Sequence, residues 1–72
     1  MRSLTFRAFI EIIQEHGFTI DRQRGTSHCV YKTWKDGRTY LVVVAGHGNT
    51  EIKPGTLGAM IRQTGLPKHL FR

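Results

Sequence analysis

His28 stands in a short stretch of the chain with basic residues on either side, Arg24 before it and Lys32 after it. An imidazole titrates near neutral pH and can take or give a proton under physiological conditions. A neighbouring cation can stabilise negative charge that develops in a transition state. Together these groups could remove the 2′-hydroxyl proton of RNA and stabilise the phosphorane, leaving a cyclic 2′,3′-phosphate. Alternatively, an isolated histidine on a β-strand can be an ordinary surface residue without a catalytic role.

The proton donor for the leaving oxygen is not apparent from the sequence. His47, Lys32 and a water molecule are the candidates, and His47 is in a glycine-rich loop where it could equally be a turn residue or contact RNA. His16 is at the end of a predicted helix and His69 is in the C-terminal tail. We assign no site to these last two.

Basic residues outnumber acidic ones, 11 Lys and Arg against 5 Asp and Glu, for a formal net charge of +6. The positive electrostatic field that this charge creates favours binding of nucleic acid or another anionic partner. The expected RNA track consists of Arg22, Arg24, Lys32, Lys35 and Arg38. Lys53 adds a charge at a helix N-terminus that could hold a phosphate, with plain capping by Thr56 or its neighbours as the alternative. The alternative for the whole track is a solvated basic surface.

The hydrophobic pattern predicts an α+β fold in the order α-β-β-β-α. The apolar spacing of Phe6, Phe9 and Ile13 indicates a first helix over residues 5–16. Strands are predicted over 18–23, 27–34 and 39–44, with a two-residue hairpin turn at Asp36-Gly37, and a second helix begins at Pro54 and ends at Gly65. The economical packing is a three-stranded antiparallel sheet with both helices on one face.

The hairpin turn fixes which residues share a face of the sheet. Tyr31 opposite Val42 suits the helix-covered side, whereas His28 and Lys32 fall on the other side, which we call the open face. We expect the Lys35–Arg38 pair next to the turn to lie on the open face as well. An exposed apolar patch usually marks a contact surface, and a partner interface is therefore predicted at Val30, Trp34, Leu41 and Val43. Trp34 could alternatively stack on a base.

The length of 72 residues predicts a single domain over residues 1–72, with a shallow groove rather than a deep pocket. No apolar run reaches the ~20 residues needed to span a membrane. Arg7 and Glu11 interrupt the apolar stretch at the N-terminus, so a signal peptide is not expected. We therefore expect a cytoplasmic protein without membrane contact. We expect the single Cys29 to be a half-buried strand residue. Neither a metal nor a cofactor is expected.

Several short motifs occur in a fixed order over residues 5–66. They are Gly17-Phe18, Arg22-Gln23-Arg24-Gly25, Ser27-His28, Val30-Tyr31, Asp36-Gly37-Arg38, His47-Gly48-Asn49, Glu51-Ile52, Pro54-Gly55-Thr56-Leu57 and Thr64-Gly65-Leu66. In this order and spacing the chain resembles the HicA-type toxins of bacterial toxin–antitoxin pairs, which are short basic domains with a double-stranded-RNA-binding-like fold. One departure is Thr26, which separates the glycine from the Ser-His pair that directly follows it in the family.

The resemblance implies a ribonuclease that cleaves mRNA and is held inactive by a HicB-type antitoxin. It also implies that the histidine of the Gly-Ser-His segment, here His28, is catalytic. Two alternatives from other classes stay open on the sequence alone. One is a non-catalytic RNA-binding module, and the other is a protein-interaction adaptor whose apolar face is its whole function.

Overall fold

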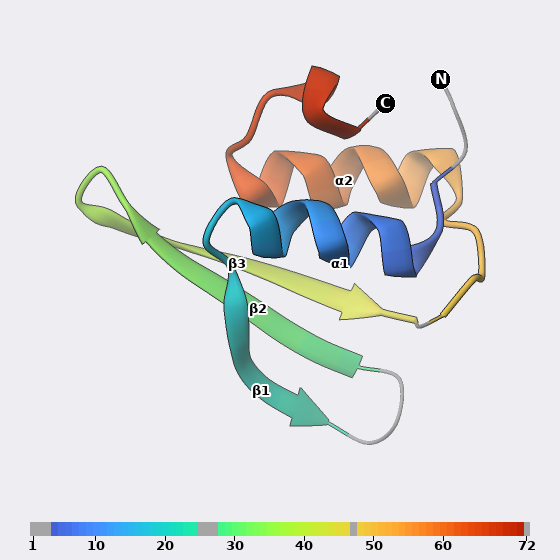
Figure 1. Cartoon of the computed structure of the whole chain (residues 1–72), viewed down its shortest axis with the longest axis horizontal. Coiled ribbons are helices and arrows are strands. Elements are labelled where there is room, and N and C mark those ends of the chain that lie inside the picture. Colours follow the sequence, from blue (N-terminus) through green and yellow to red (C-terminus); the bar gives the residue numbers. More distant parts are fainter. Residues whose placement is uncertain (1–3, 25–27, 47, 72) are drawn as a thin grey trace.

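The computed structural model describes residues 4–24, 28–46 and 48–71. Along the chain lie α1 (Phe6–Glu15), β1 (Thr19–Arg24), β2 (His28–Lys35), β3 (Arg38–Ala45), α2 (Pro54–Thr64) and the short 3₁₀ helix η1 (Lys68–Phe71) (Figure 1). The predicted α-β-β-β-α order and α+β class are confirmed. The final 3₁₀ helix is an addition that the hydrophobic pattern does not predict.

Hydrogen bonds define both ends of helix α1. The Thr5 hydroxyl accepts a hydrogen bond of 3.1 Å from the backbone N–H three residues later, a cap that is typically worth about 1 kcal/mol. At the other end, the N–H of Phe18 donates to the carbonyl of Ile13 at 3.0 Å, which folds the chain back over the last turn. The helix predicted over residues 5–16 is therefore confirmed to within one residue at each end.

The β2–β3 hairpin closes through the predicted two-residue turn. Asp36 has φ +53° and Gly37 has φ +77°, the pair of left-handed conformations that a type I′ turn requires. The turn fixes the antiparallel register, in which Tyr31 lies opposite Val42 as predicted.

The predicted position of the Lys35–Arg38 pair on the open face is wrong. The two residues do pair across the hairpin, but the Lys35 ammonium lies 5.4 Å and the Arg38 guanidinium 5.2 Å from the centroid of the Tyr40 ring. Side chains alternate strictly along β2 and β3 here, so Lys35 shares the side of Tyr31, and Arg38 shares the side of Tyr40. Both cations lie on the helix side of the sheet, at its hairpin end.

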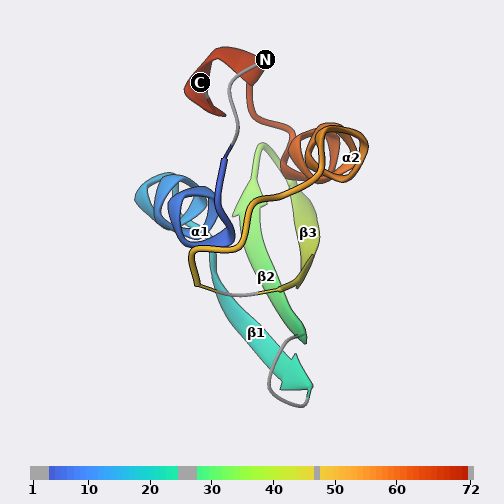
Figure 2. The same cartoon turned by 90° about the vertical axis from the view of Figure 1, so that its right-hand side faces the viewer.

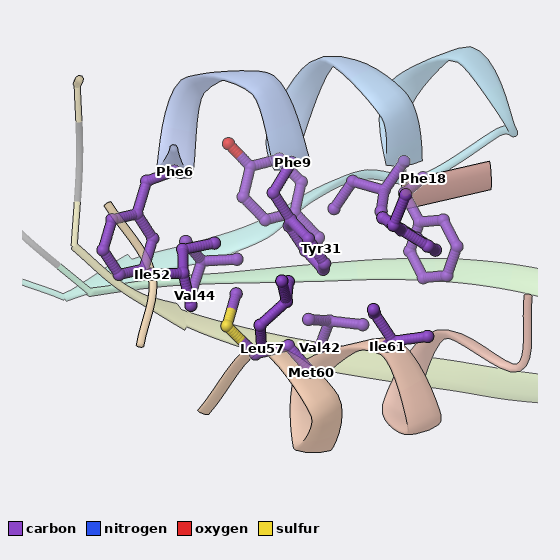
Figure 3. Packing of buried hydrophobic residues seen from close by; sticks show 12 residues of the cluster. Phe6, Phe9, Phe18, Tyr31, Val42, Val44, Ile52, Leu57, Met60 and Ile61 are labelled. Atoms are coloured by element: carbon purple, nitrogen blue, oxygen red, sulfur yellow. The ribbon is translucent and has the colours of Figure 1, made fainter. Parts of the chain in front are cut away.

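The three strands form one antiparallel sheet in the order β1-β2-β3, and both helices cover the same face of it (Figure 2). Apolar residues of the helix layer meet the inward residues of β2 and β3 in a single core (Figure 3). The helix side contributes Phe6, Phe9, Leu57, Met60 and Ile61, and the sheet contributes Tyr31, Val42 and Val44. No described helix or strand covers the opposite, open face.

The 3₁₀ helix η1 completes the core from the C-terminal end. Gly65 ends α2 with φ +70°, and a Cβ at this position would collide with the ring of Tyr40. Beyond it, the Phe71 side chain is 1% exposed. Its ring stacks on that of Phe9, with centroids 5.1 Å apart. A residue close to the chain end is thus a full member of the hydrophobic core.

We expect Phe71→Ala to lower the free energy of unfolding by about 3 kcal/mol, because it removes a buried aromatic ring and leaves a cavity beside Phe9. Urea denaturation followed by circular dichroism measures the change. Lys68→Ala alters the same 3₁₀ helix at an exposed position and is expected to have little effect. Equal, small effects of the two substitutions would show that η1 is not docked in solution.

Candidate nucleic-acid interface on the open sheet face

A β-bulge in β1 determines which of its side chains join the open face. Ile20 pairs with Tyr31, but the next pair is Arg22 with Val30, so Asp21 is an extra residue in β1. In an uninterrupted register Arg22 would lie opposite Cys29, on the helix side. The bulge moves Arg22 opposite Val30 and turns it to the open face.

His28 lies in an open hollow of about 400 Å³ that Arg22, Val30 and Val43 also line. The histidine is exposed and begins the central strand, where it pairs with Arg24 of β1 and with Ala45 of β3. Pairing on both sides fixes its backbone. An exposed imidazole, a guanidinium group and a floor of two valines therefore come together, which is a set able to hold a phosphate beside a proton-transferring group.

Lys32 does not line the hollow that contains His28. Lys32 lies four positions after His28 on β2, which is about 13 Å at the usual rise of a strand. The Lys32 ammonium is also engaged elsewhere, since its Nζ lies 2.9 Å from Oδ1 of Asp21. The predicted pairing of Lys32 with His28 as cation and base stays a prediction, and Arg22 is the described cation that lines the hollow together with His28.

Asp21 is a carboxylate between two cations on a face that is otherwise basic. In addition to Lys32, its Oδ2 lies 3.5 Å from Nε of Arg22. The hydrogen bond from Lys32, together with the charges of Lys32 and Arg22, lowers the pKa of Asp21 below its usual value against a smaller opposing effect of burial. Asp21 could not be identified from the sequence, because nothing in the residues around it indicates a β-bulge.

A second hollow, of about 460 Å³, lies beside the hairpin half of β2 and is lined from both the open face and the helix side of the sheet. Its lining is Gly17, Thr19, Lys32, Thr33, Trp34 and Thr39. Trp34 pairs with Thr39 across the hairpin and is 71% exposed. We call this hollow the Trp34 hollow, and the first one the His28 hollow.

The register places all four predicted interface residues on the open face. Val30 pairs with Val43, which is 50% exposed, and both line the His28 hollow. Leu41, 51% exposed, pairs with Lys32. The charged Lys32 side chain thus stands on β2 between Val30 and Trp34. Their role in binding a partner stays a prediction.

The remaining predicted site residues are dispersed. Lys35 and Arg38 lie at the hairpin end on the helix side. Lys53 is exposed at the N-cap position of α2, which has no side-chain cap, so the alternative of capping by Thr56 is not observed. Only the backbone pairing of Arg24 is described, and His47 and the Gly25-Thr26-Ser27 segment lie outside the described residues. The expected basic track is therefore not a single stripe.

The described residues show neither a candidate metal site nor a membrane-spanning helix. Their His, Cys, Asp and Glu side chains form no group of three or more that could hold a metal ion. None of their helices has the length and apolar character that crossing a membrane requires.

The fold and the site define a class of protein, namely a small basic α-β-β-β-α domain with two helices on one side of its sheet and an exposed histidine on the other. Over residues 6–66, most of its length, the chain matches the family model described as the HicA toxin of bacterial toxin-antitoxin. The chain therefore belongs to the HicA toxin family, and its role at that level is that of a toxin. No curated protein and no solved structure gives a significant match.

The ion pair on the open face makes a prediction about Asp21. Its pKa should lie below the ordinary value of 3.8 in the folded protein and should rise toward that value in Lys32→Met, because the strongest partner is lost. The pair stabilises the fold above pH 3.8, and this contribution disappears as the pH falls through the lowered pKa. Carboxyl chemical shifts followed by NMR during an acid titration measure both values. Lys35→Met is the matched control, and a shift of equal size in that variant would contradict the assignment.

Proposed function

We propose that the protein is a metal-independent endoribonuclease toxin of the cytoplasm that cleaves mRNA, with His28 as general base, and that a HicB-type antitoxin inhibits it. The observation that carries this proposal is the His28 hollow, where an exposed imidazole and the Arg22 guanidinium group line one depression in a chain of the HicA toxin family. The net charge of +6 supports a polyanionic substrate.

In the proposed reaction the unprotonated imidazole of His28 takes the proton of an RNA 2′-hydroxyl. The 2′-oxygen then forms a bond to the adjacent phosphorus, and the bond from phosphorus to the 5′-oxygen of the next nucleotide breaks. The leaving oxygen takes a proton from a donor, for which water and His47 are the candidates. The products are a 2′,3′-cyclic phosphate and a 5′-hydroxyl end. No redox step or further reactant is needed.

Arg22 is the proposed stabiliser of the phosphorane. It is the cation that lines the same hollow as His28, and a planar guanidinium group can donate two hydrogen bonds to phosphate oxygens at once. The bulge at Asp21 supports this role, because it is what turns Arg22 to the open face. The dispersed basic residues Lys35, Arg38 and Lys53, with Arg24, supply longer-range attraction for RNA.

The proposed antitoxin surface is the apolar part of the open face around Val30, Leu41 and Val43. Large apolar side chains that are half exposed favour a protein partner that removes them from water. Val30 and Val43 also line the His28 hollow. A partner seated on them would cover His28 directly and exclude RNA from it.

We expect wild-type protein to cleave a labelled mRNA and His28→Ala to lose cleavage by at least about 100-fold, because the general base is removed. His28 is exposed, so the substitution should leave the fold intact, and circular dichroism checks this. Gel analysis of the fragments, with and without a chelator, measures the effect, and the chelator should leave wild-type activity unchanged.

Two other outcomes would identify the alternatives. If neither protein cleaves but both bind RNA with an affinity that falls as salt rises, the chain is a non-catalytic RNA-binding module. If RNA binding is absent or insensitive to salt, a protein-interaction adaptor is the better description.

We expect the catalytic cation to be separable from the other basic residues of the open face. Arg22→Gln should lower kcat by about 100-fold, as is typical when one donor to a developing anion is lost. Lys32→Gln removes the same charge about 13 Å along β2 from His28 and should affect KM more than kcat. Single-turnover cleavage assays at saturating protein distinguish the two. A larger loss of kcat in Lys32→Gln would return the catalytic role to Lys32.

A further inference from the structure

The Trp34 hollow takes no part in the proposed cleavage, although it holds the most exposed large apolar side chain among the described residues. We propose that it is a nucleobase subsite, in which one base of a single-stranded RNA stacks on the Trp34 indole while the RNA backbone continues along β2 to the His28 hollow. This inference rests on the proposed RNA substrate and requires that RNA to be single-stranded.

The position of Trp34 gives it the properties of a stacking platform. It lies in β2 only two residues before the Asp36-Gly37 turn and pairs with Thr39, so the hairpin holds its backbone. The indole is 71% exposed. A flat aromatic surface of this kind gains from stacking against any base, because every base has a π face.

The lining of the Trp34 hollow favours a base over an apolar protein side chain. The exposed polar residues Thr19 and Thr39 border it, and Lys32 adds a cation. Polar groups that lose water must regain hydrogen bonds, and an apolar side chain cannot supply them. A base edge carries donors and acceptors that can. The His28 hollow differs, because valines form its floor.

The distance between the two hollows assigns the subsite to binding rather than to chemistry. Trp34 and His28 are six residues apart on one strand, about 20 Å at the usual rise. A base on Trp34 is therefore removed by several nucleotides from the bond that is cleaved. Lys32 stands on β2 between the two positions and is held by Asp21, close enough to a passing RNA backbone to attract it. A base within a duplex has both faces covered, so only a single strand can use the site.

Trp34 is the sole tryptophan of the chain, so its fluorescence reports directly on this hollow. The experiment uses full-length His28→Ala, in which the RNA should survive, and titrates it with a short single-stranded oligoribonucleotide. We expect strong quenching of the fluorescence at saturation. Inorganic polyphosphate, an anionic polymer without bases, should bind the protein with little quenching.

Affinity provides the second readout. Trp34→Ala should weaken binding of the same oligoribonucleotide by about tenfold or more, measured by fluorescence anisotropy of the labelled RNA, and Trp34→Phe should retain most of the affinity. Ile20→Ala removes another exposed apolar side chain, 51% exposed and outside the open face, and should change the affinity less than twofold. KM for cleavage should rise in Trp34→Ala while kcat stays near the wild-type value.

Unquenched fluorescence at saturating RNA, or equal RNA affinities of wild type and Trp34→Ala, would overturn the subsite. Loss of affinity for the antitoxin alone in Trp34→Ala would also overturn it and place the residue in the protein interface. The nuclease proposal fails separately. A wild-type protein whose tryptophan is quenched by RNA but which cleaves none would keep the subsite and remove the catalytic role.

Discussion

The central strand β2 pairs on both sides, and its register places the side chains of His28, Lys32 and Trp34. Because successive residues point to opposite faces, burial of Tyr31 in the core commits His28, Lys32 and Trp34 to the open face. A slip of one residue would bury His28 and expose Tyr31, at the cost of the core. The packing of one tyrosine under the helices thus fixes the site on the other side of the sheet, and the stability of the fold and the accessibility of His28 depend on the same pairing.

Since β2 is fixed, the adjustment that builds the His28 hollow occurs in the edge strand β1. The extra residue at Asp21 shifts the pairing by one position and brings Arg22 opposite Val30. The same bulge presents the Asp21 carboxylate to Lys32, which draws that cation toward β1. One local irregularity therefore places Arg22 beside the histidine and also brings both Arg22 and Lys32 to the Asp21 carboxylate.

Features set by local chemistry could be predicted from the sequence, and those set by distant contacts could not. The Asp36-Gly37 turn requires positive φ at two residues, and these residue types are typical of such a turn. The hairpin and its register could therefore be predicted from the sequence. The bulge at Asp21 leaves no local signal, because it only becomes favourable against the pairing of β2. The docking of Phe71 could not be predicted either, because the short segment after Pro67 shows no hydrophobic periodicity. The face of Lys35 was predictable from the alternation of the strand, and placing it on the open face went against that rule.

The described helices and strands leave one face of the sheet uncovered, and under the proposed function RNA and antitoxin must share it. The two ligands are held there by different forces. RNA depends on cations and stacking, and salt screens the first of these. An antitoxin on Val30, Leu41 and Val43 depends on burial of apolar surface, which salt does not weaken. Because both cover His28, inhibition needs no change in the histidine itself. Under the proposed function, the balance between free and inhibited toxin is therefore set by the strength of apolar contacts on β2 and β3, whereas the balance between free and RNA-bound toxin is set by charge and stacking.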